Sequence, residues 1–279
     1  MSSQDVLASE VLEFIETWGL KPDGALTTTH SSWVLPVRRN GAPAVLKVAR
    51  IPDERRGYEL MRWWNGDGAA KVLAFDDKAL LLERAFGVRD LADMARSGHD
   101  GEACRILCQT AARLHTARRE PTPDLNPLDV WFQPLFDIAG QHADLAKAAV
   151  TARRLLSEPR CVTALHGDLH HENVLDFGER GWLAIDPHGL LGERAFDFAN
   201  IFTNPDLSDP SRPVGVLPGR LQSRLEIVAE TAQVEPVRML EWIVAWTGLS
   251  AAWFIGDGDD KSAEIDLAIN GIASALLGL

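Results

Sequence analysis

The chain has 279 residues, of which 46% are hydrophobic and 24% charged, as in an ordinary soluble protein of one large or two modest domains. The 40 acidic and 28 basic residues give a formal net charge of −12, which argues against nucleic acid as a partner and is compatible with a cationic ligand. We find no membrane-spanning run, no signal peptide and only three scattered cysteines, so we expect a cytoplasmic protein without disulfides.

The first quarter of the chain combines helix and strand patterns. The segment VLASEVLEFIETWGL, residues 6–20, has apolar residues at helical spacing and reaches a glycine at its end. Two apolar runs then flank Asn40-Gly41, a dipeptide typical of tight turns, which predicts a hairpin over residues 31–50. Lys47 and Val45 lie two residues apart on the second strand and therefore share a face.

A helix and a second hairpin follow, and the chain then becomes mainly helical. ERRGYELMRWWNG, residues 54–66, predicts a helix, and KVLAFDDKALLLERAFG, residues 71–87, predicts a hairpin around Asp76-Asp77. Amphipathic helices are expected over residues 102–117, 144–158 and 237–255. A strand-rich part of about 85 residues therefore precedes a helix-rich part with one small hairpin, and a cleft between two such parts is a natural ligand site.

The segment LHGDLHHENVLDFGERGWLAIDPHG, residues 165–189, concentrates acidic, amide and imidazole side chains. Strands over residues 173–177 and 182–186 would bring Asn173 and Asp186 side by side, with Asp168 on the loop that leads in. Carboxylate and carboxamide oxygens of this kind suit Mg²⁺, a hard cation that also binds phosphates.

A zinc site is the alternative interpretation of this segment. It would activate a water for hydrolysis and would use four neighbouring side chains, His166, Asp168, His170 and His171. Ligands at adjacent and alternate loop positions seldom close around one ion, and this site would leave Asn173 and Asp186 without a role. The histidines could also simply bond the loop backbone and fill space.

These motifs resemble a known family. His166-Gly167-Asp168 is followed by Asn173 with the offset of the protein-kinase catalytic loop, and the central glycine is the form found in antibiotic kinases. With GWLAIDP, GLLGERAFDFAN and GLSAAW, residues 28–270 resemble the aminoglycoside phosphotransferase family, most of all its streptomycin 6-kinase and aminoglycoside/hydroxyurea resistance kinase members. The resemblance implies an α+β, protein-kinase-like fold, with a small strand-rich lobe over residues 1–87, a hinge near residues 83–87 and a larger helical lobe over residues 88–279.

The same resemblance implies an ATP- and Mg²⁺-dependent O-phosphotransferase. The expected acceptor is a streptomycin-type aminoglycoside, and another small metabolite or a hydroxyurea-like compound is the alternative. Asp168 would be the catalytic base, and Asn173 and Asp186 the metal ligands. Lys47 would contact the phosphates, with Glu59 on the following helix as its ion-pair partner.

Further residues have supporting roles by this resemblance. His166 would orient the loop, and Asp197 would hydrogen-bond the loop from a neighbouring helix. The linker whose backbone receives adenine would be Glu83, Arg84, Ala85 and Phe86. The chain lacks a G-x-G-x-x-G motif, and hydroxyls in the turn TTTHSSW, including those of Ser31 and Ser32, would contact the phosphates instead.

A cationic acceptor would need carboxylates and an aromatic face. The candidates downstream of the metal residues are Glu193, Trp253, Asp257, Asp259 and Asp260. Asp-Gly turns are often no more than exposed turns, and Trp131 could serve packing or binding. Asp186 is followed by Pro187-His188 and no activation segment is visible, which indicates a small-molecule kinase. A nucleotide-binding protein without transfer activity and a zinc hydrolase remain the other classes.

Overall fold

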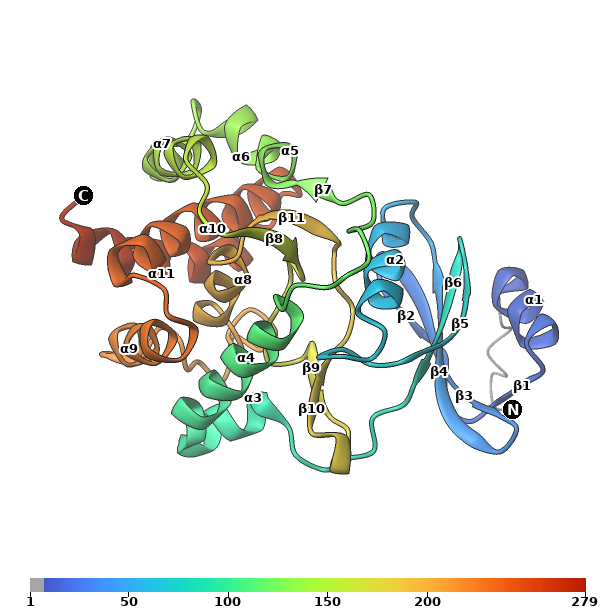
Figure 1. Ribbon diagram of the computed structural model, residues 1–279. Helices are drawn as coiled ribbons and strands as arrows, with labels where there is room; N and C mark the ends of the chain where they lie inside the picture. The colour runs from blue at the N-terminus through green and yellow to red at the C-terminus, as the bar shows by residue number, and fades with distance from the viewer. Residues whose placement is uncertain (1–7) are drawn as a thin grey trace.

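Two hairpins form most of the N-terminal sheet, as their turn sequences predict (Figure 1). Asn40 and Gly41 both have positive φ, the conformation that a tight two-residue hairpin turn requires. The computed structural model describes residues 8–279, so Val6 and Leu7 of the first predicted helix lie outside the described residues. The strand order is β1-β3-β4-β6-β5, with β2 paired to β3; the bounds are β1 (Leu20–Pro22), β2 (Thr27–Thr28), β3 (Ser32–Arg39), β4 (Ala42–Ala49), β5 (Val72–Asp76) and β6 (Ala79–Glu83).

Two helices cover opposite faces of this sheet (Figure 1). Helix α1 (Ser9–Thr17) packs on the face that includes Leu46 and Val48 of β4. Helix α2 (Glu54–Trp64) lies on the other face, toward the C-terminal lobe. Because side chains alternate along a strand, Lys47 projects from β4 toward α2.

Helices make up most of the C-terminal lobe, and the three predicted amphipathic segments are all helical. These three are α4 (Asp100–Leu114), α7 (Ala143–Ser157) and α10 (Pro236–Gly256). The other helices are α3 (Leu91–Met94), α5 (Leu128–Trp131), α6 (Gln133–Ile138), α8 (Phe196–Ala199), α9 (Arg220–Ala232) and α11 (Asp260–Leu277), with one π-helical turn, η1 (Ala95–His99), and two 3-10 helical turns, η2 (Gly178–Arg180) and η3 (Asn200–Phe202).

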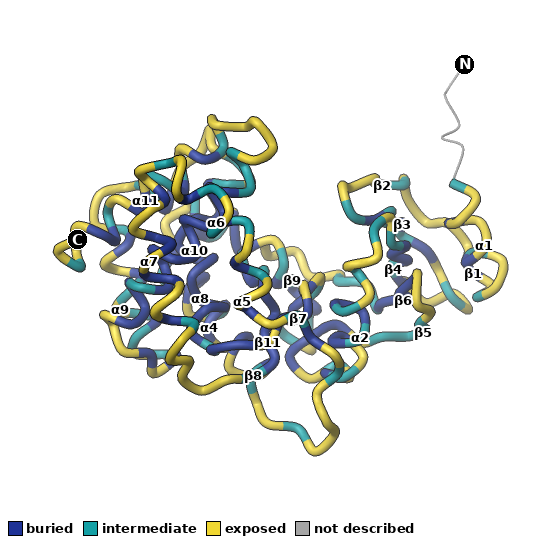
Figure 2. The backbone as a smooth tube through the Cα atoms, turned by 90° about the horizontal axis from the view of Figure 1, so that it is seen from above, coloured by how far each residue is buried: buried dark blue, intermediate teal, exposed yellow. Residues whose placement is uncertain are grey.

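Helix α10 is the central helix of this lobe. Among the described residues it is the one helix that is long and apolar enough to cross a membrane, yet 72% of its apolar 18-residue stretch is buried inside the protein. It packs against α7 and α11, and Figure 2 shows most of its residues as buried. Its apolar composition therefore reflects its position in the core.

The C-terminal lobe contains the predicted hairpin and also a sheet that the sequence patterns did not predict. Strands β9 (Val174–Asp176) and β10 (Trp182–Ala184) pair antiparallel across the predicted turn. The unpredicted sheet has the order β7-β11-β8 and the bounds β7 (Asn126–Pro127), β11 (Leu190–Glu193) and β8 (Val162–Leu165). Strands β8 and β11 are the antiparallel pair that flanks residues 166–189, so this sheet anchors both ends of that segment.

Candidate active site

One buried carboxylate, that of Asp197, hydrogen-bonds the loop that follows β8. Asp197 on α8 accepts hydrogen bonds from the backbone amides of His166 at 2.9 Å and Gly167 at 2.8 Å. It also bonds the ring of His115, at the end of α4, at 2.8 Å. Gly167 has a φ of +83°, and a Cβ there would lie 2.7 Å from a Leu190 methyl carbon, so a side chain at this position would be strained and crowded. Asp197 therefore makes the loop contacts expected of it, whereas His115 was not singled out from the sequence.

His166 links this loop to the hairpin. Its Nε2 donates to the carbonyl oxygen of Ile185 at 2.8 Å, and its Nδ1 accepts from the amide of Asp168 at 3.2 Å. Burial lowers the pKa of His166, which keeps the ring neutral. Both ring nitrogens are occupied in an orienting role, so His166 is a poor metal ligand.

The four-ligand zinc arrangement is not assembled. His171 is buried, and burial together with the charge of Arg224 lowers its pKa well below the ordinary value. Across residues 8–279 no group of three or more His, Cys, Asp or Glu side chains is placed to hold a metal ion. The arrangement of the side chains thus argues against the zinc interpretation.

Asp168 is held by two amide groups, one on each carboxylate oxygen. Asn173 Nδ2 donates to Oδ2 at 2.8 Å, and Asn200 Nδ2 donates to Oδ1 at 2.7 Å. Burial acts to raise the pKa of Asp168, but the neighbouring His170 and His188 outweigh it and bring the pKa below its ordinary value. Asp168 is therefore ionised at neutral pH. The sequence patterns did not predict a role for Asn200, although it lies three residues after Asp197 and so on the same side of a helical turn.

Asn173 and Asp186 lie at the open end of the hairpin, as predicted. The amide of Ile185 donates to the carbonyl oxygen of Asn173 at 2.9 Å, and Asp186 follows directly with a φ of +61°. Because Asn173 Nδ2 is bound to Asp168, its Oδ1 is the atom left to face a cation. A carboxamide oxygen and a half-exposed carboxylate are a donor set that fits Mg²⁺.

Lys47 connects the two lobes. Its buried ammonium bonds Glu54 at 2.6 Å and also contacts the carboxylate of Asp186, 139 positions away in the chain. Burial acts to lower the pKa of Lys47, but Asp186 and Glu54 raise it above the ordinary value, so the ammonium stays charged. The positive charge therefore lies next to the candidate metal ligand.

The prediction that Glu59 pairs with Lys47 is wrong. Glu59 bonds Arg55 at 3.0 Å on the helix surface. Glu54 and Tyr58 are one turn apart on the face of α2 that meets the sheet, and the Tyr58 ring centre is 5.6 Å from the Lys47 ammonium. Five residues at 3.6 per turn rotate Glu59 by about 140° from Glu54, away from β4.

Helix α2 approaches the segment after Asp186 very closely. A Cβ on Gly57 would lie 2.0 Å from the carbonyl oxygen of Pro187. Gly189, with a φ of +73°, similarly meets the backbone of Arg56. These glycines let the N-terminal lobe pack on the metal-ligand segment, and neither was singled out from the sequence.

The linker between the lobes is tied to the hairpin. Gly87 donates its amide to the carbonyl oxygen of Asp176 at 2.9 Å, and Arg89 bonds the Asp176 side chain at 2.7 Å. Glu83 accepts from the amide of Lys71 at 2.5 Å and also pairs with Arg180. Adenine binding by Glu83, Arg84, Ala85 and Phe86 stays a prediction.

The phosphate-loop prediction is corrected for one of its two serines. Ser32 opens β3 and is 0% exposed, so its hydroxyl is closed to a phosphate, and its amide donates to Thr29 Oγ1 at 2.9 Å. Ser31 lies at the turn and lines a cavity of about 260 Å³ between the lobes, together with Glu54, Trp131 and His188. Ser31 remains the candidate phosphate contact.

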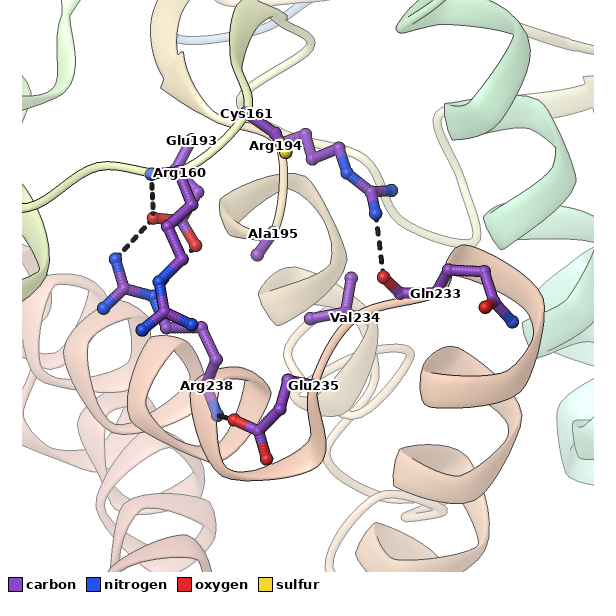
Figure 3. A pocket seen from close by; sticks show the side chains of 9 residues that line it. All are labelled: Arg160, Cys161, Glu193, Arg194, Ala195, Gln233, Val234, Glu235 and Arg238. Atoms are coloured by element: carbon purple, nitrogen blue, oxygen red, sulfur yellow. Dashed lines mark hydrogen bonds and ion pairs between the residues drawn. The ribbon is translucent and has the colours of Figure 1, made fainter.

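Glu193 is not placed to bind an acceptor, contrary to expectation. Its carboxylate is 3% exposed and bonds Arg238 at 2.6 and 3.0 Å and the amide of Arg160 at 2.9 Å. Figure 3 shows Glu193 between these arginines beside a pocket of about 180 Å³. The residues that line this pocket include neither Asp168 nor Lys47, because Glu193 joins β11 to α10 on another side of the lobe.

The other acceptor candidates lie at the junction of α10 and α11. Asp259 caps α11 by accepting from the amide of Ser262 at 3.1 Å and its hydroxyl at 2.6 Å, so its carboxylate already has a structural role. Trp253 packs edge-on against Trp131 at 5.4 Å, which links it to the cavity between the lobes. Substrate contacts by Asp257, Asp260 and Trp253 stay predictions.

The chain is similar to known antibiotic kinases along nearly its whole length. The streptomycin 3″-kinase of Klebsiella pneumoniae is 67% identical over 265 residues, which cover 94% of this chain and 100% of that protein. The streptomycin 6-kinase of Streptomyces glaucescens is 32% identical, with 98% of this chain and 90% of that protein covered.

Solved structures and a family model agree with this similarity. A thermostable mutant of the aminoglycoside phosphotransferase APH(4)-Ia, in ternary complex with ADP and hygromycin B, has a TM-score of 0.68 at 15% identity, with 96% of this chain and 98% of that chain covered. The expected α+β, protein-kinase-like fold is thus confirmed. The model of the family described as aminoglycoside/hydroxyurea antibiotic resistance kinases matches residues 17–258. The chain belongs to this family of small-molecule kinases.

Proposed function

We propose that this chain transfers the γ-phosphoryl group of ATP to the 3″ position of streptomycin. The observation that carries the proposal is the convergence of Lys47 from one lobe with Asp168, Asn173 and Asp186 from the other. The 3″ position is favoured over the 6 position because the 3″-kinase relative is 67% identical and the 6-kinase relative 32%. A net charge of −12 suits a cationic acceptor.

Four side chains have separate roles in the proposed phosphoryl transfer. Mg²⁺ held by Asn173 and Asp186 would neutralise charge on the phosphates. Lys47, kept protonated by its two carboxylate neighbours, binds phosphate oxygens in the cleft. Asp168 orients the acceptor hydroxyl and takes its proton.

The lowered pKa of Asp168 is compatible with this role. An ionised carboxylate is always ready to accept a proton at neutral pH, although it is a weak base. In phosphoryl transfer, positioning and electrostatic stabilisation contribute most of the rate, so a strong base is unnecessary.

The test is incubation of the purified protein with ATP, Mg²⁺ and streptomycin, read by ADP release, product mass and NMR assignment of the phosphorylated position. We expect a product heavier by one phosphoryl group at 3″. Asp168→Asn should lose about 10²- to 10⁴-fold in turnover with ATP affinity nearly unchanged, because the base is lost and the nucleotide site is kept.

Three other outcomes would each refute a different part of the proposal. Modification at the 6 position would refute the 3″ assignment and retain the kinase. ADP release without modified streptomycin would refute the acceptor and direct the search to other hydroxylated compounds. Full activity of Asp168→Asn would refute the role of Asp168.

A further inference from the structure

A short helical segment, residues 196–202, contacts the catalytic loop twice. Asp197 binds the loop backbone, and Asn200, three residues later, donates to Asp168 Oδ1 at 2.7 Å. The Asn200 side chain is buried, with 4% of the residue exposed. A buried amide that donates to a carboxylate forms a strong, charge-assisted hydrogen bond.

The orientation of the Asn200 amide is set by its other partner. Asn204 Nδ2 donates to Asn200 Oδ1 at 2.8 Å, so the Asn200 Nδ2 must face Asp168. The carbonyl oxygen of Asn204 accepts from the buried Arg224 at 2.8 Å, and Arg224 pairs with Asp100 at 2.6 Å. This series of bonds ties the Asp168 carboxylate to the core of the C-terminal lobe.

We propose that Asn200 is a positioning residue that holds Asp168 in the orientation required to meet the acceptor hydroxyl. A carboxylate can rotate about its χ2 torsion, and two donors, one on each oxygen, stop that rotation. Asn173 couples Asp168 to the metal site, whereas Asn200 couples it to the protein core. The inference rests on the proposed phosphotransfer and adds a residue to its machinery.

Two variants separate positioning from simple packing. Asn200→Ala should lower kcat about 10- to 100-fold, as for the loss of one hydrogen bond to a charged group, with the KM for ATP changed less than about two-fold. Asn200→Asp has nearly the same shape and keeps the acceptor for Asn204, but it places a carboxylate against Asp168. Asn200→Asp should therefore be slower than Asn200→Ala, whereas a packing role predicts that the variant of matched shape is the better one.

The control is Ile201→Val. Ile201 follows Asn200 directly and is fully buried, and its apolar side chain makes no hydrogen bond to Asn200 or to Asp168. This variant should lose some thermal stability and keep kcat within about two-fold of the wild-type value. All variants are compared at equal folded fraction by circular dichroism.

A double-mutant cycle with Asp168→Asn completes the test. If Asn200 acts through Asp168, Asn200→Ala should have little further effect on kcat in the Asp168→Asn background, whereas additive losses would overturn the proposal. Wild-type kcat in both Asn200 variants would overturn it as well.

The cycle can also be run without streptomycin, on the slow ADP release in which water replaces the acceptor. Failure of the streptomycin assay therefore refutes the proposed acceptor, while additivity in this water reaction refutes the role of Asn200.

Discussion

At the residue scale, the ammonium of Lys47 is a buried cation between two carboxylates from different lobes. Glu54 approaches it from α2 and Asp186 from the segment after β10. A buried charge that loses one partner remains largely uncompensated. The loss of either carboxylate should therefore affect the enzyme more than the loss of a surface ion pair. The ion pair of Glu59 and Arg55 on the same helix is the surface pair for comparison with the buried one, because the Arg55 side chain is 55% exposed.

We expect Glu54→Gln to lower kcat/KM for ATP by about 10- to 100-fold, since the ammonium loses a charged acceptor. Glu59→Gln should change the same ratio less than about two-fold. Steady-state kinetics at fixed Mg²⁺ measures both variants. Equal losses in the two would contradict the assignment of Glu54 as the partner of Lys47.

At the scale of elements, local patterns predicted the hairpins and the long helices, because turn dipeptides and helical periodicity act within a few residues. The β7-β11-β8 sheet was missed because its strands have two to four residues, too few for a pattern, and Asn126 pairs with Leu190 far along the chain. The contact between α2 and Pro187 was missed for a similar reason, since a glycine in a helix gives no sign of what approaches it.

Gly57→Ala should disturb the docking of α2 on the metal-ligand segment. The added Cβ meets a backbone carbonyl, which cannot rotate away, and we expect a loss of about 1–3 kcal/mol in stability together with lower kcat. Gly271→Ala is the matched control, because a Cβ at this exposed position of α11 has no atom within 4 Å. That control should gain up to about 1 kcal/mol from better helix propensity.

Urea unfolding and steady-state kinetics on both proteins test this expectation. Unchanged stability and activity of Gly57→Ala would show that the two elements can separate without cost.

At the scale of the whole molecule, the interface of α10 and α11 contains a buried acid. Asp266 on α11 is 0% exposed, and burial raises its pKa to about 8. The folded protein therefore keeps a proton on Asp266 at pH values where the unfolded chain has released it. Because the folded state then binds more protons than the unfolded state, stability falls as pH rises between about 4 and about 8.

The contribution of Asp266 should reach about 1.4 kcal/mol per pH unit within this window. Asp266→Asn should remove that slope and be more stable than the wild type at pH 8, whereas Asp260→Asn, exposed on the same helix, should keep it. Urea unfolding at pH 5, 7 and 9 measures the slopes. The same pH slope in Asp266→Asn and in the wild type would exclude Asp266 as its origin.

The sequence by itself determined those contacts between site residues that depend on local geometry. A fixed offset places Asn173 within reach of Asp168, and a short hairpin brings Asp186 next to them, because neighbouring residues have few alternative conformations. The tertiary structure alone decided that Lys47 binds Glu54 rather than Glu59, that Glu193 is used in a buried ion pair, and that Asn200 reaches Asp168. Those contacts depend on which face each helix presents after the lobes have packed, and packing is a property of the whole chain that no short segment encodes.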